Sequence, residues 1–168
     1  MSRSKSFLIL CVNPGSTSTK LALFRGTECL ESSSLEHSGE ELAGFSTVAD
    51  QVEFRMKLAE EFISSALPAC APGENLAAVI GRGGLLAPLT GGVYAVGERM
   101  CADLLAAKYG EHASNLGAIL ARGLAAKRGI PAWIADPVVV DELEPLARYS
   151  GLPELPRLSI FHALNQKS

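Results

Sequence analysis

The sequence predicts a single α/β domain built on a mixed β-sheet, and three observations support this prediction. Short apolar segments and longer amphipathic segments follow one another, with three strands first and helices between the later strands. The chain has 168 residues, an ordinary size for one domain. Its 48% hydrophobic and 20% charged residues are typical of a globular protein, and this balance excludes disorder, collagen and a coiled coil.

The first three strands are predicted to form an antiparallel meander. Residues 6–12 are almost continuously apolar, which favours a central strand that is buried on both faces. Residues 13–18 are a turn by composition, and residues 19–25 resume as a strand. After a second turn at Gly26, residues 29–36 alternate well enough for a third strand.

A helix and a parallel strand are expected next. Asp50 opens the helix, with Glu53 at the spacing of a capping box, and Pro68 ends it. Residues 76–81 then return as a strand, which we expect to run parallel to the first because a helix connects the two. Residues 81–92 are rich in glycine and are expected to form a loop with little regular structure.

The second half of the chain contains two amphipathic segments, residues 98–108 and 114–128, which predict two helices. The second of them ends in Lys-Arg-Gly-Ile-Pro, in which a basic last turn, a glycine and a proline are helix-stop signals. Residues 132–135 predict a short strand. A short helix near 141–149 and a last strand at 158–164 complete the expected sheet domain.

Charge and cysteine content narrow the functional class. The net charge of −3 and the pI near 5.6 argue against a nucleic-acid-binding module, whose contact surface is usually basic. The apolar run after the basic N-terminus is too short for a signal peptide, and no run is long enough to span a membrane. The four cysteines form no CxxC pair, which favours reduced thiols in the cytoplasm over a zinc site.

Two glycine-containing segments at predicted strand ends are candidate anion sites. Residues 13–20 (Asn-Pro-Gly-Ser-Thr-Ser-Thr-Lys) offer backbone N–H groups, hydroxyls and one positive charge, although they do not form a P-loop pattern. A phosphate loop and a plain hairpin turn explain them equally well. Arg82 stands between glycines at the end of a predicted parallel strand, where its uncrowded guanidinium would suit a carboxylate or phosphoryl group. A surface arginine in a flexible loop is the alternative.

Three further residues are candidates, each with a plainer alternative. His112 precedes a predicted helix N-terminus, where it would face an anion or serve only the local structure. Asp136 follows a strand, where it could hold Mg²⁺, orient a substrate or simply form a turn before proline. His162 could be a ligand or a core histidine. Arg82, Asp136 and the serine-rich turn all fall at ends of one predicted sheet, which indicates anion and phosphoryl chemistry.

Five segments, in order and at compatible spacing, carry a resemblance to a known family. They are residues 13–20 (NPGSTSTK), 81–86 (GRGGLL), 110–117 (GEHASNLG), 136–143 (DPVVVDEL) and 159–167 (SIFHALNQK). Together they resemble the butyrate kinases of the acetokinase family, within the acetate and sugar kinase/Hsp70/actin superfamily. The resemblance extends from about residue 7 to the last residue. Branched-chain fatty-acid kinases are a close alternative that these segments do not separate.

The resemblance implies a ribonuclease-H-like domain and a reversible reaction in which butyrate and ATP give butyryl phosphate and ADP, with Mg²⁺. The implied residues on the phosphate side of the cleft are Asn13, Ser16, Ser18 and Lys20. The implied catalytic residues are Arg82, Asp136, His112 and His162. By this resemblance, Arg82 would bind the acyl carboxylate or the phosphoryl group, and Asp136 would orient the carboxylate or hold the metal through water. The two histidines would donate to the transferring phosphoryl group.

The family has two similar domains, and residues 1–168 resemble only the N-terminal one. By this resemblance the C-terminal nucleotide-binding domain would be missing from residues 1–168, so we expect the chain by itself to be inactive. A non-catalytic anion-binding α/β domain is the alternative description. The resemblance implies a short-chain carboxylate or acyl phosphate as partner, with no nucleic acid and no membrane, and a homo-oligomer for the full-length protein.

Overall fold

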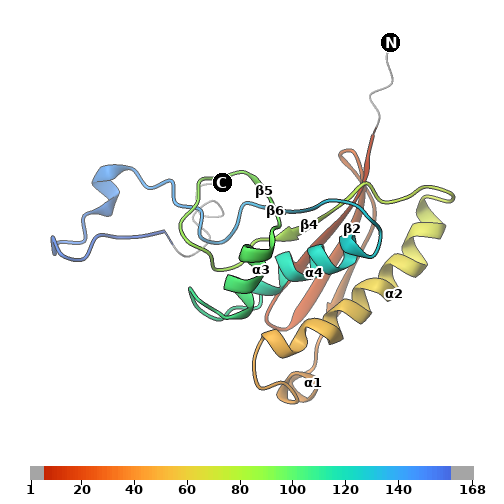
Figure 1. Ribbon diagram of the computed structural model, residues 1–168, viewed down its shortest axis with the longest axis horizontal. Coiled ribbons are helices and arrows are strands. Elements are labelled where there is room, and N and C mark those ends of the chain that lie inside the picture. Colours follow the sequence, from red (N-terminus) through yellow and green to blue (C-terminus); the bar gives the residue numbers. More distant parts are fainter. Residues whose placement is uncertain (1–5, 160–168) are drawn as a thin grey trace, which may run out of the picture.

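The structure is a computed structural model that describes residues 6–159, and it contains a six-stranded sheet with the strand order β3-β2-β1-β4-β6-β5 (Figure 1). The strands are β1 (Leu8–Pro14), β2 (Ser18–Arg25), β3 (Glu28–Glu36), β4 (Ala78–Arg82), β5 (Val93–Ala95) and β6 (Ala132–Ala135). The α-helices are α1 (Gly39–Ala43), α2 (Val52–Cys70), α3 (Glu98–Leu105) and α4 (Asn115–Ala126). Two short 3₁₀ helices, η1 and η2, span Ala49–Gln51 and Pro145–Arg148.

The pairing of the strands confirms the predicted mixed sheet. Strands β1, β2 and β3 form an antiparallel meander, while β4 runs parallel to β1 and β6 runs parallel to β4. The parallel pairs follow from the connections, because α2 links β3 to β4 and α4 precedes β6, and a helical crossover returns the chain in its original direction. The three parallel strands therefore end at the same edge of the sheet.

Two expected features at the ends of α2 are wrong. Asp50 does not open this helix with Glu53 as its partner. Its carboxylate accepts a hydrogen bond from the N–H of Thr47, whose hydroxyl accepts from the N–H of Asp50, so the reciprocal pair lies one turn earlier, before η1. Pro68 lies inside α2, which continues to Cys70. The proline is tolerated because it falls in the last turn, where only one intrahelical hydrogen bond is lost.

Three differences concern short segments. The glycine-rich loop contains β5, which pairs antiparallel with β6 at the sheet edge and is too short, at three residues, for its alternation to be recognised. The helix expected near 141–149 is only the 3₁₀ turn η2. Residues 158–159 are not in a strand, and the remainder of the strand expected at 158–164 lies outside the described residues. Within residues 6–159 no helix is long and apolar enough to cross a membrane.

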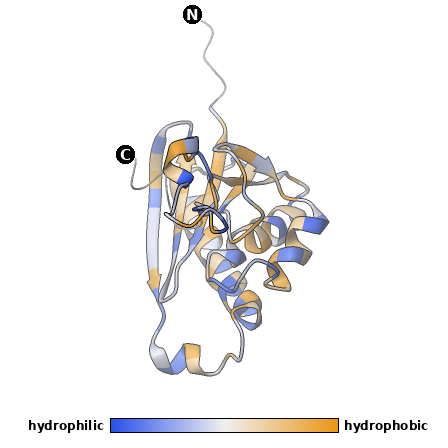
Figure 2. Cartoon of the chain, turned by 90° about the vertical axis from the view of Figure 1, so that its left-hand side faces the viewer, coloured by the Kyte–Doolittle hydropathy of each residue, from blue (hydrophilic) through white to orange (hydrophobic). Residues whose placement is uncertain are grey.

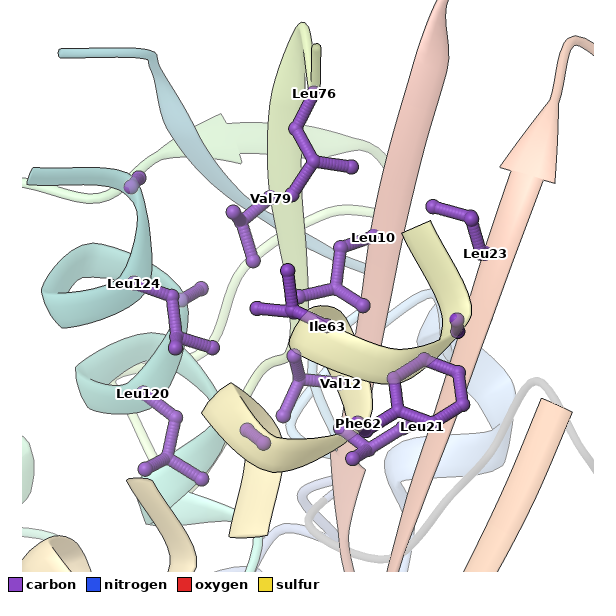
Figure 3. Close-up of a cluster of buried hydrophobic side chains, with 14 of the residues drawn as sticks. Leu10, Val12, Leu21, Leu23, Phe62, Ile63, Leu76, Val79, Leu120 and Leu124 are labelled. Carbon is purple, nitrogen blue, oxygen red and sulfur yellow. The ribbon is translucent and has the colours of Figure 1, made fainter. Parts of the chain in front are cut away.

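The main core lies between one face of the sheet and the helices α2 and α4. Hydrophobic and hydrophilic residues are interleaved along both strands and helices (Figure 2). The apolar residues that face the helices pack into one cluster, in which side chains of α2 and α4 meet those of β1, β2 and β4 (Figure 3). Leu10, Val79, Leu120 and Leu124 are fully buried there. This packing fixes the sheet, and with it the positions at the strand ends.

Candidate functional site

A polar row crosses the sheet where the parallel strands end. Asn13 lies at the end of β1, Arg82 is the last residue of β4 and Asp136 follows the last residue of β6. The register places these strand ends side by side, since Val12 pairs with Gly81 and Arg82 pairs with Ala135. Ligands in such sheets bind at the carboxyl ends of the strands, so this edge is the natural place for a site.

The polar row lines a cavity of about 620 Å³ on the sheet face opposite α2 and α4. Asn13, Lys20, Arg82 and Asp136 are all among its lining residues. Strand alternation explains why, because Leu10 and Val12 point into the core whereas Cys11 and Asn13 point to the other face. The structure thus brings together four of the eight residues that the sequence analysis singled out.

Lys20 extends the polar row onto the antiparallel part of the sheet. It pairs directly with Asn13 on β1 and with Ser34 on β3. Among the described residues that line the cavity, the charged ones are Lys20, Arg82 and Asp136, which together carry one more positive than negative charge. Two cations that converge on one cavity favour binding of an anion there.

Asp136 is held by its backbone and its side chain at once. Its N–H donates to the carbonyl of Gly92 at 3.0 Å, and its carboxylate Oδ1 accepts from the N–H of Gly92 at 2.8 Å. Its φ of 39° lies in the left-handed region, which aspartate adopts more readily than most residues. These contacts fix the carboxylate at the edge of the sheet where the parallel strands end. The carboxylate remains exposed, so a ligand can reach it.

The glycines around Arg82 have a packing role that the sequence analysis missed. We expected them to leave the guanidinium uncrowded, but each lies against another part of the backbone. A Cβ on Gly81 would lie 2.1 Å from the carbonyl oxygen of Gly117 in α4, and a Cβ on Gly83 would lie 2.4 Å from Pro137. The glycines therefore let α4 and the segment after β6 approach the end of β4. The side chain of Arg82 itself is half-buried, with its Nε buried.

His112 precedes the N-terminus of α4, as expected, but it is not among the residues that line the cavity. Its Nδ1 accepts a hydrogen bond from the N–H of Ser114 and lies 2.7 Å from the Ser114 hydroxyl. The neighbouring Asn115 accepts from the N–H of Leu85 and donates to the carbonyl of Gly110. In this structure His112 thus contacts Ser114 at the N-terminus of α4. Its implied role in phosphoryl transfer stays a prediction.

Ser16 lies in the β1–β2 turn and Ser18 is the first residue of β2, both beyond the pair formed by Asn13 and Lys20. The N–H of Gly15 donates to the carbonyl of Ser18 at 2.7 Å and closes this turn. Neither serine is among the residues that line the cavity. His162 lies outside the described residues. The implied roles of these three residues stay predictions.

The cavity also contains residues that sequence reasoning did not single out. Ser32 and Ser34 of β3 pair with Ala22 and Lys20 and so lie on the cavity face. The run Ser32-Ser33-Ser34 in an alternating strand was the available signal. Cys11 also lines the cavity, and burial raises the pKa of its thiol, which therefore stays protonated and unreactive at neutral pH.

Asp136 has the one carboxylate among the cavity-lining residues that the structure describes. Residues 6–159 contain no cluster of three or more histidine, cysteine or acidic side chains that would hold a metal by itself. Mg²⁺, however, commonly binds through one or two carboxylates together with substrate phosphates and water. Asp136 in the company of a bound phosphate fits that pattern, whereas a site made of protein ligands alone does not.

Comparison with known proteins identifies relatives of the chain, although no family model matches it. Butyrate kinase 2 of Clostridium acetobutylicum is 50% identical over 162 residues, which cover 96% of this chain and 45% of that protein. A protein named probable butyrate kinase from Enterococcus faecalis is 52% identical over 163 residues, with coverage of 95% and 43%. The chain therefore spans less than half the length of the relatives it matches.

Solved structures share the fold at low sequence identity. An acetate kinase from Porphyromonas gingivalis superposes with a TM-score of 0.61 at 17% identity, covering 96% of this chain and 47% of that one. An acetate kinase from Entamoeba histolytica gives a TM-score of 0.52 at 12% identity, with coverage of 94% and 44%. The mixed sheet and these neighbours confirm the expected ribonuclease-H-like fold class. Over nearly its whole length, the chain is similar to these butyrate kinases, and it corresponds to less than half of their length.

Proposed function

We propose that this chain forms the substrate-binding part of a short-chain fatty-acid kinase, which converts butyrate and ATP into butyryl phosphate and ADP. The observation that carries the proposal is the row of Asn13, Lys20, Arg82 and Asp136 along one cavity. The identity of about half of the residues to butyrate kinases supports the same assignment. This row of residues would form a binding surface for anions, and both the carboxylate and the phosphoryl group of this reaction are anions.

The proposed reaction needs positioning more than proton transfer. A butyrate oxygen attacks the γ-phosphorus of ATP, a new P–O bond forms, and the bond to the bridging oxygen breaks so that ADP leaves with the electron pair. The carboxylate is already ionised at neutral pH and needs no general base. Catalysis therefore depends on alignment of the two anions and on neutralisation of their mutual repulsion.

Lys20 and Arg82 are suited to that neutralisation. The planar guanidinium of Arg82 can make two parallel hydrogen bonds to a carboxylate or phosphoryl group, and Lys20 adds a point charge from the neighbouring strand pair. Asp136 would orient the butyrate carboxylate or hold Mg²⁺ through water. When bound with ATP, Mg²⁺ supplies further charge neutralisation. Asn13 would donate a neutral hydrogen bond beside the two cations.

The remaining parts of the proposal concern the longer protein. Residues 1–168 would form an N-terminal acetokinase-type domain, and a second domain would bring the nucleotide site. Ser16, Ser18, His112 and His162 would approach the phosphoryl group when the two domains enclose the substrates. A cytoplasmic location and a homo-oligomer of the full-length protein belong to the same proposal.

The test uses the acyl hydroxamate assay with butyrate and ATP. We expect no turnover from the 168-residue chain, and turnover once the chain is joined to the remaining part of butyrate kinase 2 of Clostridium acetobutylicum. In this chimera Arg82→Ala should lower kcat/KM by about a hundredfold, the usual cost of removing a group that stabilises transition-state charge. Arg25→Ala is the matched control, because Arg25 pairs with Glu74 on the surface at the far end of β2, and it should change little.

Two alternatives predict different results. A non-catalytic anion-binding domain would bind inorganic phosphate through Arg82 without any turnover in the chimera. A branched-chain fatty-acid kinase would prefer isobutyrate or isovalerate to butyrate, although one methylene changes binding by only about 1–3 kcal/mol. Turnover by the 168-residue chain alone would contradict the proposal that a second domain supplies the nucleotide site.

A further inference from the structure

A fully buried arginine lies behind the β1–β2 turn, on the side of the sheet that the helices cover. Arg55 of α2 has no exposed surface at all. Among residues 6–159 its hydrogen-bond partners are all uncharged, and it takes part in none of the ion pairs found there. A buried charge without a carboxylate is costly, so its retention calls for a specific role.

Arg55 binds the first residues of β2 directly. One guanidinium nitrogen donates to the carbonyl of Ser18 at 3.0 Å and to the hydroxyl of Thr19 at 3.0 Å. Its Nε and its other terminal nitrogen both donate to the side-chain oxygen of Gln51, one turn earlier near the start of α2. Gln51 thus aims the guanidinium, and the guanidinium holds the backbone of β2 where the turn ends.

The acceptor that Arg55 binds is also the acceptor that closes the turn. The carbonyl of Ser18 receives the N–H of Gly15 at 2.7 Å, and this hydrogen bond defines the turn that carries Ser16. A charged donor on the same carbonyl fixes its direction more firmly than a neutral one would. Arg55 therefore holds the turn from the helix side of the sheet, while Ser16 stays exposed to solvent.

His37 holds the same turn from the end of β3. Its N–H donates to the carbonyl of Thr17 at 2.8 Å, and its Nε2 lies 2.8 Å from the hydroxyl of Thr19, which Arg55 also contacts. The imidazole is buried and packs edge-on against Phe54. Burial, together with the charge of Arg55, lowers the pKa of His37, so the ring is neutral at neutral pH and Arg55 is the single cation of the cluster.

We propose that Arg55 is a positioning residue, which fixes the Gly15–Ser18 turn in the geometry that receives an anion. The proposal rests on the function proposed above, since it takes the turn to face the phosphate side of the cleft. Arg55 does not touch the substrate. It acts through the carbonyl of Ser18 and the hydroxyl of Thr19, and so lowers the conformational entropy that the turn would lose on binding.

The first experiment measures the order of the turn without any ligand. Amide hydrogen exchange is followed at Gly15 in the 168-residue chain and in its Arg55→Met variant. We expect exchange at Gly15 to be about tenfold faster in the variant, the effect of losing one charged hydrogen bond. The amide of Gly26, which donates to Phe7 at the opposite end of β2, is the internal control and should change much less. Equal acceleration at both glycines would mean general destabilisation and would overturn the proposal.

The second experiment measures binding of inorganic phosphate by calorimetric titration well below the melting temperature. Arg55→Met should bind phosphate about tenfold more weakly than the unchanged chain, and Arg55→Lys should recover part of the loss. Arg128→Met is the matched control, because Arg128 ties α4 to Glu60 of α2 away from the turn and should lower stability without changing the affinity.

The two proposals fail in different ways. If the unchanged chain does not bind phosphate, the proposed anion site is contradicted, and the exchange at Gly15 alone decides whether Arg55 orders the turn. If Arg55→Met binds phosphate as tightly as the unchanged chain, the role of Arg55 is overturned and the proposed function stands.

Should Arg55→Met not fold, Thr19→Val replaces it, because it removes the shared hydroxyl while keeping the shape. It should then accelerate exchange at Gly15 more than at Gly26, and equal exchange would overturn the proposal.

Discussion

The two faces of the sheet are built from alternating residues of the same strands, yet they have opposite character. On the covered face, Leu10 and Val12 are buried against α2 and α4. On the cavity face, their neighbours Cys11 and Asn13 line the candidate site. Residues that stabilise the core and residues that can contact a ligand are thus neighbours along one strand. A substitution on one face should therefore affect stability, and one on the other face should affect binding.

The largest expected effect breaks the covered face. Leu10→Ala should lower the free energy of unfolding by about 2–5 kcal/mol, because it removes buried methyl groups and leaves a cavity in the core. Cys11→Ala, one residue further along β1 and only half-buried, should cost less than about 1 kcal/mol. Urea denaturation of the two variants measures the difference. Similar losses in both would contradict the division between the two faces.

A smaller effect is expected at the contact between Gly117 of α4 and Arg82 at the end of β4, where a packing change also reaches the candidate site. Gly117→Ala places a Cβ 1.9 Å from the carbonyl oxygen of Arg82, so α4 or the end of β4 must move. We expect a loss of about 1–3 kcal/mol in stability together with weaker phosphate binding, because Arg82 moves with its strand. Gly123→Ala in the same helix is the control. Its Cβ meets only the flexible end of Met56, and both stability and phosphate binding should stay near those of the unchanged chain.

The smallest expected effect is a pH dependence of stability caused by His37, which contacts the β1–β2 turn. The pKa of His37 is lowered below its ordinary value of 6.5 in the folded chain, first by burial and then by the charge of Arg55. The unfolded chain therefore binds a proton more readily, and the stability that His37 contributes is present above about pH 6.5 and lost as the pH falls below it.

Replacement of His37 sharpens this comparison. Between pH 7.5 and 5.5 the unchanged chain should lose more stability than the His37→Gln variant, because only its unfolded form gains the proton of His37 readily. Urea denaturation at the two pH values measures both losses, and the other titrating groups cancel in the difference between the chains. An identical pH dependence in the two chains would show that His37 does not titrate differently on folding.

Much of the fold could be predicted because its signals are local. The apolar run of β1, the alternation of β2 and β3 and the long amphipathic pattern of α2 each specify an element from consecutive residues. The expected parallel pairing then followed from the helix that connects the strands. The errors have two causes. The three residues of β5 are too few to show a pattern. The effect of Pro68 depends on its place in the helix, and the last turn of α2 accommodates it.

The candidate site could be predicted in part. Arg82 and Asp136 were singled out because they follow predicted strands, whereas Asn13 and Lys20 came from the polar segment 13–20 and the family resemblance, and the structure brings all four to one cavity. Arg55 was not found, because an arginine in an amphipathic helix is ordinarily a surface residue. Its complete burial depends on Thr19 and Ser18, which are distant in the sequence.

Most of the elements, the mixed sheet and the family resemblance could be deduced from the sequence alone, since these depend on patterns of neighbouring residues. Only the tertiary structure decided which polar residues share the cavity. It also decided that the glycines beside Arg82 serve the approach of α4, and that Arg55 is buried behind the turn. The physical reason is that burial and contact arise between residues that the fold brings together from distant segments, whereas periodicity records only the preference of one segment for a face.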